Sequence, residues 1–327
     1  MKLNLTRRSM LGGVAAVAGL SALSVPARAA TVLRYGNAGN PGTLSNQFNK
    51  KLSDMISAKT NGGLSFEIFA GSLGGEQKLL ESMALGSLDV YNGAYTGTRQ
   101  FDIFYSPYFF KDGAHAKRVL DSDIGTAASA ELKSRYNGRL LGAGRLGSYN
   151  LMLKEPIKSL ADLKGRKIRS PQIEGCLEAL KHFGAIPTPI PFNEIYLSLQ
   201  NGIVDGVLTA LNPGVQGKFY EVCKYVVTTD FGLALDKEVI SEAVWTSLPD
   251  DQKTALQTSF TELEEAEYYQ VGLKLKDVDL AAWGAANGQD ALITLDATGL
   301  AAEMEPVNKR LADEVYGPGA WDKIKAL

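Results

Sequence analysis

Apolar residues recur with two different periods along the chain after residue 30, and these periods predict a regular succession of strands and helices. Residues 31–37 (TVLRYGN) and 64–70 (LSFEIFA) alternate apolar and polar positions, which is typical of half-buried strands. Residues 45–59 and 79–84 carry apolar side chains at helical spacing, and a strand follows at 88–91. This β-α-β-α-β order predicts a mostly parallel sheet with helices covering it.

A second set of strands and helices begins after Asn137. Residues 138–144 (GRLLGAG) and 166–171 (RKIRSP) have the pattern of strands, and residues 173–185 (IEGCLEALKHFGA) have that of a helix. A further helix at 193–202 (NEIYLSLQNG) leads into another strand. Two separate β/α sets in one chain predict an α/β protein of two lobes rather than one continuous sheet, with a cleft between the lobes.

The C-terminal part of the chain contains a long stretch with few helix breakers. Ser247 and Pro249 provide a helix start, and little interrupts the helix before residues 284–288. About 35 residues at 1.5 Å each would extend roughly 50 Å, which exceeds the width of one lobe. The apolar positions do not keep a coiled-coil heptad, so we expect this helix to lie along both lobes. A last strand at 291–296 and a helix at 301–317 complete the pattern.

Composition and charge narrow the class of protein. The chain has 327 residues and a formal net charge of −2, which excludes a strongly basic nucleic-acid-binding protein. Hydrophobic residues make up 45% of the chain, which is too many for a disordered protein and enough for two domains of ordinary size. We therefore expect a folded protein without a nucleic-acid partner.

The N-terminal residues have the pattern of an export signal. A charged start is followed by an apolar run at residues 10–25 and by Ala27-Arg28-Ala29, which fits a signal-peptidase site. Residues 6–11 (TRRSML) resemble a twin-arginine signal, the other interpretation being an ordinary secretory signal that contains two arginines. We expect residues 1–29 to be a cleaved signal peptide. No later apolar stretch is long enough to cross a bilayer, so the mature chain is expected to be soluble.

The sequence lacks the motifs that would support catalysis or metal binding. It has no Gly-x-Ser-x-Gly motif, no Gly-x-Gly-x-x-Gly after a strand and no Walker loop, and its histidines and cysteines do not have metal-ligand spacing. We therefore expect no enzyme activity, no cofactor and no metal. Export permits a disulfide between Cys176 and Cys223, but both lie in helix-like segments, and buried free thiols are the other interpretation.

One cationic residue stands where α/β proteins bind small ligands. Arg169 ends the strand predicted within LKGRKIRSPQ (163–172), just before a Ser-Pro break. The carboxyl ends of such strands line the crevices in which these folds bind ligands. A guanidinium group can hold a carboxylate through two parallel hydrogen bonds. Arg169 is therefore either the anchor of a ligand carboxylate or one half of a structural ion pair with a nearby Asp or Glu.

Nearly the whole mature chain resembles the DctP-type solute-binding proteins of tripartite ATP-independent periplasmic (TRAP) transporters. The stretches that carry the resemblance occur in the family's order: GSLGGEQKLLESMALGSLDV, SPYFFKDGAHAKRVLD, SLADLKGRKIRSP, FGAIPTPIPFNEIYLSLQNGIVDG and KFYEVCKYV. The resemblance implies two α/β lobes, connecting strands and a long helix that bridges both lobes. It also implies a periplasmic protein that binds an organic acid and delivers it to a membrane permease driven by an ion gradient.

The resemblance further implies how the chain is divided and how it assembles. We expect residues 30–146 and 235–274 to form lobe I, and residues 147–234 and 275–327 to form lobe II. The family's default state implies a monomer. Presentation of the ligand to a sensor kinase is an alternative function that the sequence leaves open.

Several ligand-binding positions follow from matching the family's motifs to this chain. The signature arginine falls on Arg169, which would hold the ligand carboxylate, and the aromatic residue that packs over the ligand falls on Phe192. Asn37 after the first strand, and the residues from Asn92 to Tyr95 after the third strand, would line the wall of the first lobe.

Two positions depart from the family's pattern. Many relatives carry a second arginine where this chain has Tyr149, with Arg145 close by as a replacement. Many also carry an asparagine where this chain has Thr209, with Asn212 as its neighbour. These exchanges make the pocket less polar, so we expect a monocarboxylate with an apolar or aromatic body. A C4-dicarboxylate or a keto acid is the alternative.

Overall fold

The computed structural model describes residues 30–327, with gaps at 95–96 and 264–268, so the predicted signal peptide and Tyr95 lie outside the described residues. The strands are β1 (Thr31–Asn37), β2 (Leu64–Ala70), β3 (Val90–Gly93), β4 (Gly138–Leu153), β5 (Lys167–Ser170), β6 (Ile186–Pro189), β7 (Gly206–Ala210), β8 (Tyr225–Val227), β9 (Leu233–Ser241) and β10 (Leu292–Ile293). The helices are α1 (Leu44–Lys59), α2 (Glu76–Ala84), α3 (Arg99–Asp102), α4 (Gly113–Leu120), α5 (Asp123–Tyr136), α6 (Glu174–His182), α7 (Ile195–Gln200), α8 (Leu211–Gln216), α9 (Glu242–Ser247), α10 (Asp250–Leu263), α11 (Tyr269–Asn287), α12 (Leu300–Tyr316) and α13 (Ala320–Ala326).

The first lobe is built around β1, β2 and β3, as the alternating pattern predicts. β1 pairs in parallel with β2 and β3, and Leu33 lies opposite Phe66 in the β1–β2 register. α1 packs on β2, and it begins where the Thr43 side chain accepts a hydrogen bond from the Asn46 amide. α1 gives way to a turn in which Asn61 adopts a φ of 50°, in the left-handed region where asparagine is tolerated better than most residues.

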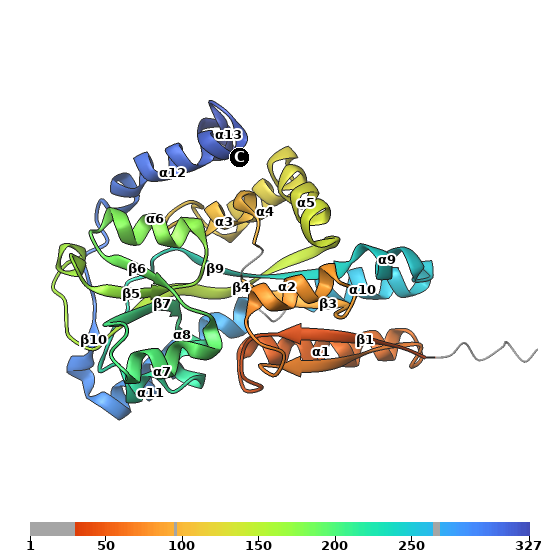
Figure 1. Cartoon of the computed structure of the whole chain (residues 1–327), viewed down its shortest axis with the longest axis horizontal. Coiled ribbons are helices and arrows are strands. Elements are labelled where there is room, and N and C mark those ends of the chain that lie inside the picture. Colours follow the sequence, from red (N-terminus) through yellow and green to blue (C-terminus); the bar gives the residue numbers. More distant parts are fainter. Residues whose placement is uncertain (1–29, 95–96, 264–268) are drawn as a thin grey trace, which may run out of the picture.

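The second lobe is built around β5, β6 and β7, which are parallel to one another. α6 packs on β5 and β6 (Figure 1). Pro187 and Pro189 lie in β6, at the end of the strand order, where a missing backbone donor breaks no central ladder. The fold is therefore an α/β architecture of two lobes, with the parallel strands of each lobe ending near the space between them.

Two long antiparallel strands, β4 and β9, join the lobes (Figure 1). β9 pairs with β3 in the first lobe, and β4 pairs with β7 in the second, so the strand order β2-β1-β3-β9-β4-β7-β5-β6 is continuous. The sequence predicted two lobes rather than one continuous sheet. The two lobes are present, but the absence of a continuous sheet was a wrong prediction, because β4 and β9 link the strands of both lobes. The β4–β9 register shifts between Leu140 and Gly142, where a side chain at Gly142 would meet the Phe260 ring at 2.1 Å.

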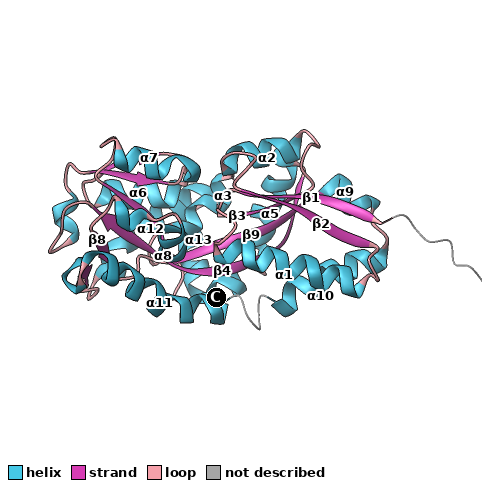
Figure 2. Ribbon diagram, turned by 90° about the horizontal axis from the view of Figure 1, so that it is seen from below, coloured by secondary structure: helices cyan, strands magenta, loops and turns pink. Residues whose placement is uncertain are grey.

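The helical stretch after Ser247 reaches both lobes. α10 packs against α1 in the first lobe, whereas α11 packs against α8 and β4 in the second lobe (Figure 2). Trp283 of α11 is fully buried, and its Nε1 donates a hydrogen bond of 3.0 Å to the Lys224 carbonyl. The residues between the two helices, 264–268, lie outside the described part of the chain.

The C-terminal helices also contact both lobes. α12 packs on α6 and on α3, and the His115 ring of α4 lies 2.8 Å from the Ile324 carbonyl of α13. Cys176 and Cys223 are buried free thiols, which confirms the second of the two interpretations offered by the sequence. Across the described ranges, no helix combines the length and apolarity needed to cross a membrane.

Candidate ligand-binding cleft

A cavity lies between the two lobes, beside the strands that join them. The loop after β1, the start of α1 and the start of α2 form its first-lobe side, and β4, β7 and Phe192 form its second-lobe side. The lining residues are Asn37, Ala38, Gly39, Thr43, Ser45, Glu76, Gly93, Ala94, Leu146, Tyr149, Phe192, Thr209, Ala210, Pro213, Ala234, Leu235 and Asp236. Four residues that the sequence assigns to the ligand are thus brought together: Asn37, Tyr149, Phe192 and Thr209.

Arg169 lies in a neighbouring cavity that shares Glu76 with the first. Its Nε donates to the Ile190 carbonyl at 2.8 Å, and its Nη1 donates to the Leu208 carbonyl at 3.4 Å. Only 3% of Arg169 is exposed, and its guanidinium forms no ion pair with the carboxylates of the described residues. Burial lowers the pKa of Arg169 to about 10, against the opposing charge of Glu76. The side chain is therefore a buried cation held in place by neutral acceptors.

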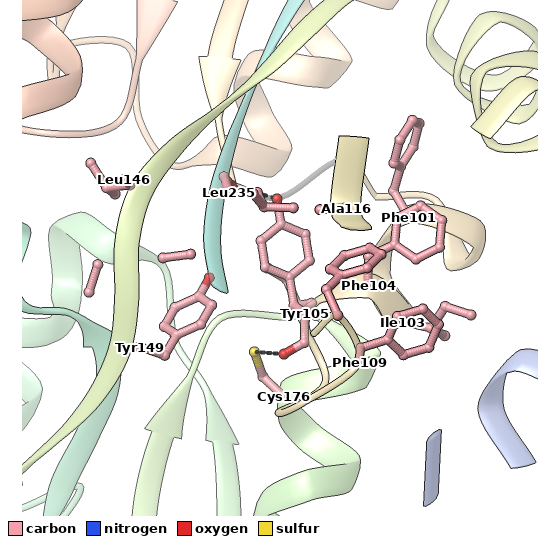
Figure 3. Packing of buried hydrophobic residues seen from close by; sticks show 14 of the residues in the cluster. Phe101, Ile103, Phe104, Tyr105, Phe109, Ala116, Leu146, Tyr149, Cys176 and Leu235 are labelled. Carbon is pink, nitrogen blue, oxygen red and sulfur yellow. Dashed lines mark hydrogen bonds between the residues drawn. The ribbon is translucent and has the colours of Figure 1, made fainter. Parts of the chain in front are cut away.

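Two aromatic side chains form the second-lobe wall. Phe192 begins a 3₁₀ turn (Phe192–Glu194), and its ring lies 6.0 Å from that of Phe219. Tyr149 of β4 is buried beside Tyr105, with the ring centroids 6.1 Å apart in an edge-to-face arrangement (Figure 3). Burial raises the pKa of Tyr149 well above its ordinary range, so its hydroxyl stays protonated. These rings give the cavity an apolar wall with a single hydroxyl.

Asn37 lines the first-lobe side of the cavity and is held in place by hydrogen bonds. Its Nδ2 donates to the Asn92 carbonyl at 3.0 Å and to Asn92 Oδ1 at 2.8 Å, while its Oδ1 accepts from the Gly39 amide at 2.7 Å. Asn92 does not belong to the cavity lining, and its Nδ2 lies 3.4 Å from Glu238 Oε2. Asn37 thus lines the cavity, whereas Asn92 supports it from the layer beneath.

The cavity is also lined by two carboxylates, which matching of the family's motifs did not identify as site residues. Glu76 is the first residue of α2 and accepts a hydrogen bond of 3.2 Å from the Ala94 amide. Asp236 lies in β9 and accepts a hydrogen bond from the Ser45 hydroxyl. A signal was present in the sequence, because Asp236, Lys237 and Glu238 interrupt an otherwise apolar strand. Burying three consecutive charged side chains in a strand costs free energy unless hydrogen bonds or opposite charges compensate for it. Such a run in a buried strand therefore suggests a functional site.

Lys237 and Glu238 lie beside the cavity rather than in its lining. Lys237 is buried against the rings of Phe101 and Tyr105, and its ammonium donates to the Tyr105 hydroxyl. Burial lowers the pKa of Lys237 to about 7. Glu238 accepts a hydrogen bond of 2.8 Å from the Tyr35 hydroxyl, and burial raises its pKa to about 8. Its second oxygen, Oε1, has no hydrogen-bond partner in the described structure.

Three further predicted positions are not among the lining residues. Asn212 is buried at the start of α8, where it hydrogen-bonds to the Leu44 amide and to Asp279 instead. Arg145 pairs through its backbone with Leu235 across β4 and β9, and its side chain lies outside the description. Tyr95 falls in the gap at 95–96. In the described residues no group of His, Cys, Asp and Glu side chains is arranged to hold a metal ion.

A cavity between two α/β lobes, joined by crossing strands and flanked by a buried cation, defines a binding protein of the two-lobed class. Residues 35–277 match the model of the DctP family, described as bacterial extracellular solute-binding protein, family 7. The chain belongs to this family, the DctP-type solute-binding proteins of TRAP transporters.

Relatives of known name cover most of the chain. It is 28% identical over 304 residues to the sialic acid-binding periplasmic protein SiaP of Vibrio cholerae, which covers 91% of this chain and 94% of that protein. It is 30% identical to the 2,3-diketo-L-gulonate-binding periplasmic protein YiaO of Escherichia coli, with 80% of each chain covered.

Solved structures share the fold. A TRAP periplasmic solute-binding protein from Roseobacter denitrificans, with bound L-galactonate, matches with a TM-score of 0.81 and 24% identity, covering 90% of this chain and 98% of that chain. One from Desulfovibrio salexigens, with bound orotic acid, matches with a TM-score of 0.80 and 24% identity, covering 90% and 97%. At this level of identity the likeness concerns the fold alone.

Proposed function

We propose that this protein captures an organic acid in the periplasm, encloses it between the two lobes and delivers it to the membrane permease of a TRAP transporter. Membership of the family supports this role. The single observation that carries the proposal is Arg169, a cation that is 3% exposed at the end of β5 and forms no ion pair with a carboxylate of the described residues. A buried cation that forms no ion pair is costly, and a ligand carboxylate removes that cost.

The mechanism follows from the arrangement of the lobes. Arg169 binds the carboxylate through charge-assisted hydrogen bonds, and its Nε contact with Ile190 fixes the plane of the guanidinium. Phe192 and Tyr149 cover the body of the ligand with their rings. Closure of the lobes about β4 and β9 expels water, which strengthens the ion pair. Reopening at the permease, onto which surfaces of both lobes dock, releases the acid.

The wall of the cavity supports a monocarboxylate with an apolar or aromatic body rather than a small dicarboxylate. Tyr149 and Thr209 occupy positions that would hold a second cation and an amide in many relatives, and both line the cavity. A second ligand carboxylate would have no arginine at Tyr149 to receive it. Hydroxyl groups and rings instead favour an uncharged body.

The proposal is tested by replacing Arg169 and, as a control, the nearby Arg166. Arg169→Ala is expected to weaken binding of the acid roughly 100-fold or more, because the anion loses its hydrogen bonds while still losing water. Arg166→Ala is the matched control, since Arg166 donates to the carbonyls of Glu155 and Pro156 away from the cavity. Isothermal titration with the acid that co-purifies from the periplasm measures both. Equal affinities for Arg169→Ala and wild type would contradict the proposal.

A further inference from the structure

Lys237 is a buried cation that the proposed mechanism does not use. It lies in β9, one of the two strands that join the lobes, and only 1% of it is exposed. Its ammonium donates to the Ala94 carbonyl at 3.1 Å and to the Tyr105 hydroxyl, and it forms no ion pair with a carboxylate of the described residues. Burying such a cation costs free energy. Its hydrogen bonds lead directly to the wall of the cavity.

The peptide groups of Ala94, which lines the cavity, are held on both sides. The amide donates to Glu76 Oε1 at 3.2 Å, and the carbonyl lies 3.1 Å from Lys237 Nζ and 2.5 Å from the Tyr105 hydroxyl. Leu235 also lines the cavity, and its carbonyl lies 2.7 Å from the same hydroxyl. A hydroxyl carries one hydrogen and satisfies one of these two carbonyls at a time, so the ammonium of Lys237 supplies the second donor.

Tyr105 extends this arrangement to the aromatic wall. It ends the 3₁₀ turn Ile103–Tyr105, and its ring packs edge-to-face against Tyr149 with the centroids 6.1 Å apart (Figure 3). Burial raises the pKa of Tyr105 well above its ordinary range, so its hydroxyl stays protonated and able to donate. Tyr105 does not line the cavity itself, but it contacts three residues that do: Ala94, Leu235 and Tyr149.

We propose that Lys237 and Tyr105 are positioning residues of the ligand site, which fix the Ala94 carbonyl and support the Tyr149 ring and thereby set the shape of the cavity. This inference rests on the proposed function and adds two residues that act without touching the ligand. Without the ammonium, one of the two carbonyls loses its donor, and the backbone after β3 has to turn to find another. The wall then fits the ligand less well, so affinity falls.

The charge of Lys237 gives this role a pH dependence. Burial lowers the pKa of Lys237 to about 7, against the charges of Asp102 of α3, Asp236 of its own strand and Glu76 of α2, which face it. Tyr105 faces it from the 3₁₀ turn as a neutral hydroxyl. A carboxylate bound in the cavity adds negative charge, which raises this pKa, so binding takes up a proton. Affinity therefore falls as pH rises above 7.

The first experiment needs no ligand. The protein is labelled with ¹⁵N-alanine, and the amide resonance of Ala94 is followed from about pH 5.5 to about pH 8.5. We expect the wild-type resonance to move with a midpoint near pH 7, and Lys237→Met to lose about half of this movement or more. Lys224→Met is the control, because Lys224 also lies over a tyrosine ring, 5.2 Å from the centroid of Tyr225, but is exposed. A wild-type resonance that does not titrate, or equal movement in Lys237→Met, overturns the proposal.

The second experiment measures binding and stability together. Isothermal titration uses the acid that co-purifies from the periplasm, identified by mass spectrometry and added back after dialysis. Lys237→Met and Tyr105→Phe are each expected to bind it roughly 10-fold more weakly, while the melting temperature of Lys237→Met stays at or above that of wild type, because a buried charge has been removed. The double variant should be little weaker than the weaker single variant, since both residues hold the same pair of carbonyls. Unchanged affinity in the single variants, or additive losses, overturns the proposal.

The pH dependence of affinity separates positioning from a purely structural role. Wild-type affinity is expected to fall about 3-fold or more between about pH 6.5 and about pH 8.5, and Lys237→Met to lack most of this fall. Glu238→Gln is the control, because burial raises the pKa of Glu238 to about 8 while its hydrogen bond to Tyr35 lies on the other face of the strand. This variant should keep the fall. The same pH dependence in Lys237→Met and wild type overturns the proposal.

Failure of this inference is distinguishable from failure of the proposed function. If Arg169→Ala abolishes binding and Lys237→Met changes neither the affinity nor its pH dependence, the carboxylate anchor stands and the positioning role is excluded. If Arg169→Ala leaves binding intact, the proposed function itself is wrong, and the Ala94 resonance still tests the contact with Lys237.

Discussion

The side chain of Asn212 connects the two lobes, because its Oδ1 accepts a hydrogen bond of 3.0 Å from the backbone amide of Leu44. Leu44 begins α1 in the first lobe, and Asn212 lies in α8 of the second. The Nδ2 group of Asn212 donates to Asp279 Oδ2 of α11 at 3.1 Å, which fixes the orientation of the amide. The interaction satisfies one of the free amides at the start of α1 and exists only when the lobes are together.

Asn212→Ala is expected to weaken binding of every ligand by a similar factor, roughly 3- to 10-fold, because one buried hydrogen bond of the closed form is lost. The loss should appear as faster dissociation, since the variant opens more readily. Titration and stopped-flow measurements give both quantities. Asn201→Ala, at the exposed end of α7, is the control. Loss of binding for some ligands only would mean that Asn212 contacts the ligand directly.

Phe192→Ala is expected to weaken binding roughly 10-fold or more, because the ring covers the ligand and leaves a void when it is removed. Phe192→Leu should recover part of the affinity. Tyr149→Phe keeps the ring and removes only the hydroxyl, so its effect reports a hydrogen bond separately from packing. Isothermal titration of the three variants measures these contributions. An unchanged affinity in Phe192→Ala would place the ligand elsewhere in the cleft.

The buried carboxyl of Glu238 is expected to make stability depend on pH. Its pKa is about 8 in the folded protein against an ordinary value of 4.5, so the folded state holds a proton that the unfolded state releases between these pH values. Glu238 therefore lowers the free energy of unfolding as pH rises from 4.5 to 8. Lys237 acts in the opposite sense above pH 7, since the folded state releases its proton first.

Glu238→Gln mimics the protonated carboxyl, because its Oε1 can accept the hydrogen bond from Tyr35 and its amide replaces the oxygen without a partner. The melting temperature of wild type should fall by several degrees relative to this variant between pH 5 and pH 8. Calorimetry in a pH series measures the difference. If the melting temperatures of wild type and Glu238→Gln differ by the same amount at every pH in this range, Glu238 is already ionised in the folded protein.

Gly142→Ala is expected to lower the free energy of unfolding by about 1–3 kcal/mol. The new methyl group on β4 would lie 2.1 Å from the ring of Phe260 in α10. Phe260→Ala alone also destabilises, since it leaves a cavity. In the double variant the methyl group has room, so its cost should be less than the sum of the single costs. Chemical denaturation of the four proteins measures the coupling. Additive costs would contradict this close contact.

Local patterns predicted much of the fold. Hydrophobic periodicity identified β1, α1, β2, α2 and β3. Each of these elements buries one face, and the resulting spacing of apolar residues can be read from a single sequence. The continuity of the sheet was not predictable in this way, because β4 changes partners along its length and pairs with segments far away in the chain. The residue boundaries of the two lobes stay a prediction.

The candidate site was predicted only in part. Asn37, Thr209 and Phe192 line the cavity because each belongs to or follows a strand that ends there, whereas Tyr149 lies within β4, which continues to Leu153. Asn212 faces the other lobe instead, and no local pattern reports a contact with a residue 168 positions away. Glu76 and Asp236 were missed because an acidic residue at a helix start or in a strand usually faces solvent.

The central claim is that the guanidinium of Arg169 binds the carboxylate of the ligand. A crystal structure of the protein with the acid that co-purifies with it tests this claim most directly. The account predicts a carboxylate oxygen about 2.7–2.9 Å from a guanidinium nitrogen of Arg169, inside the closed cleft. A ligand bound with no atom in contact with Arg169, or an Arg169 side chain turned to solvent in the complex, would contradict it.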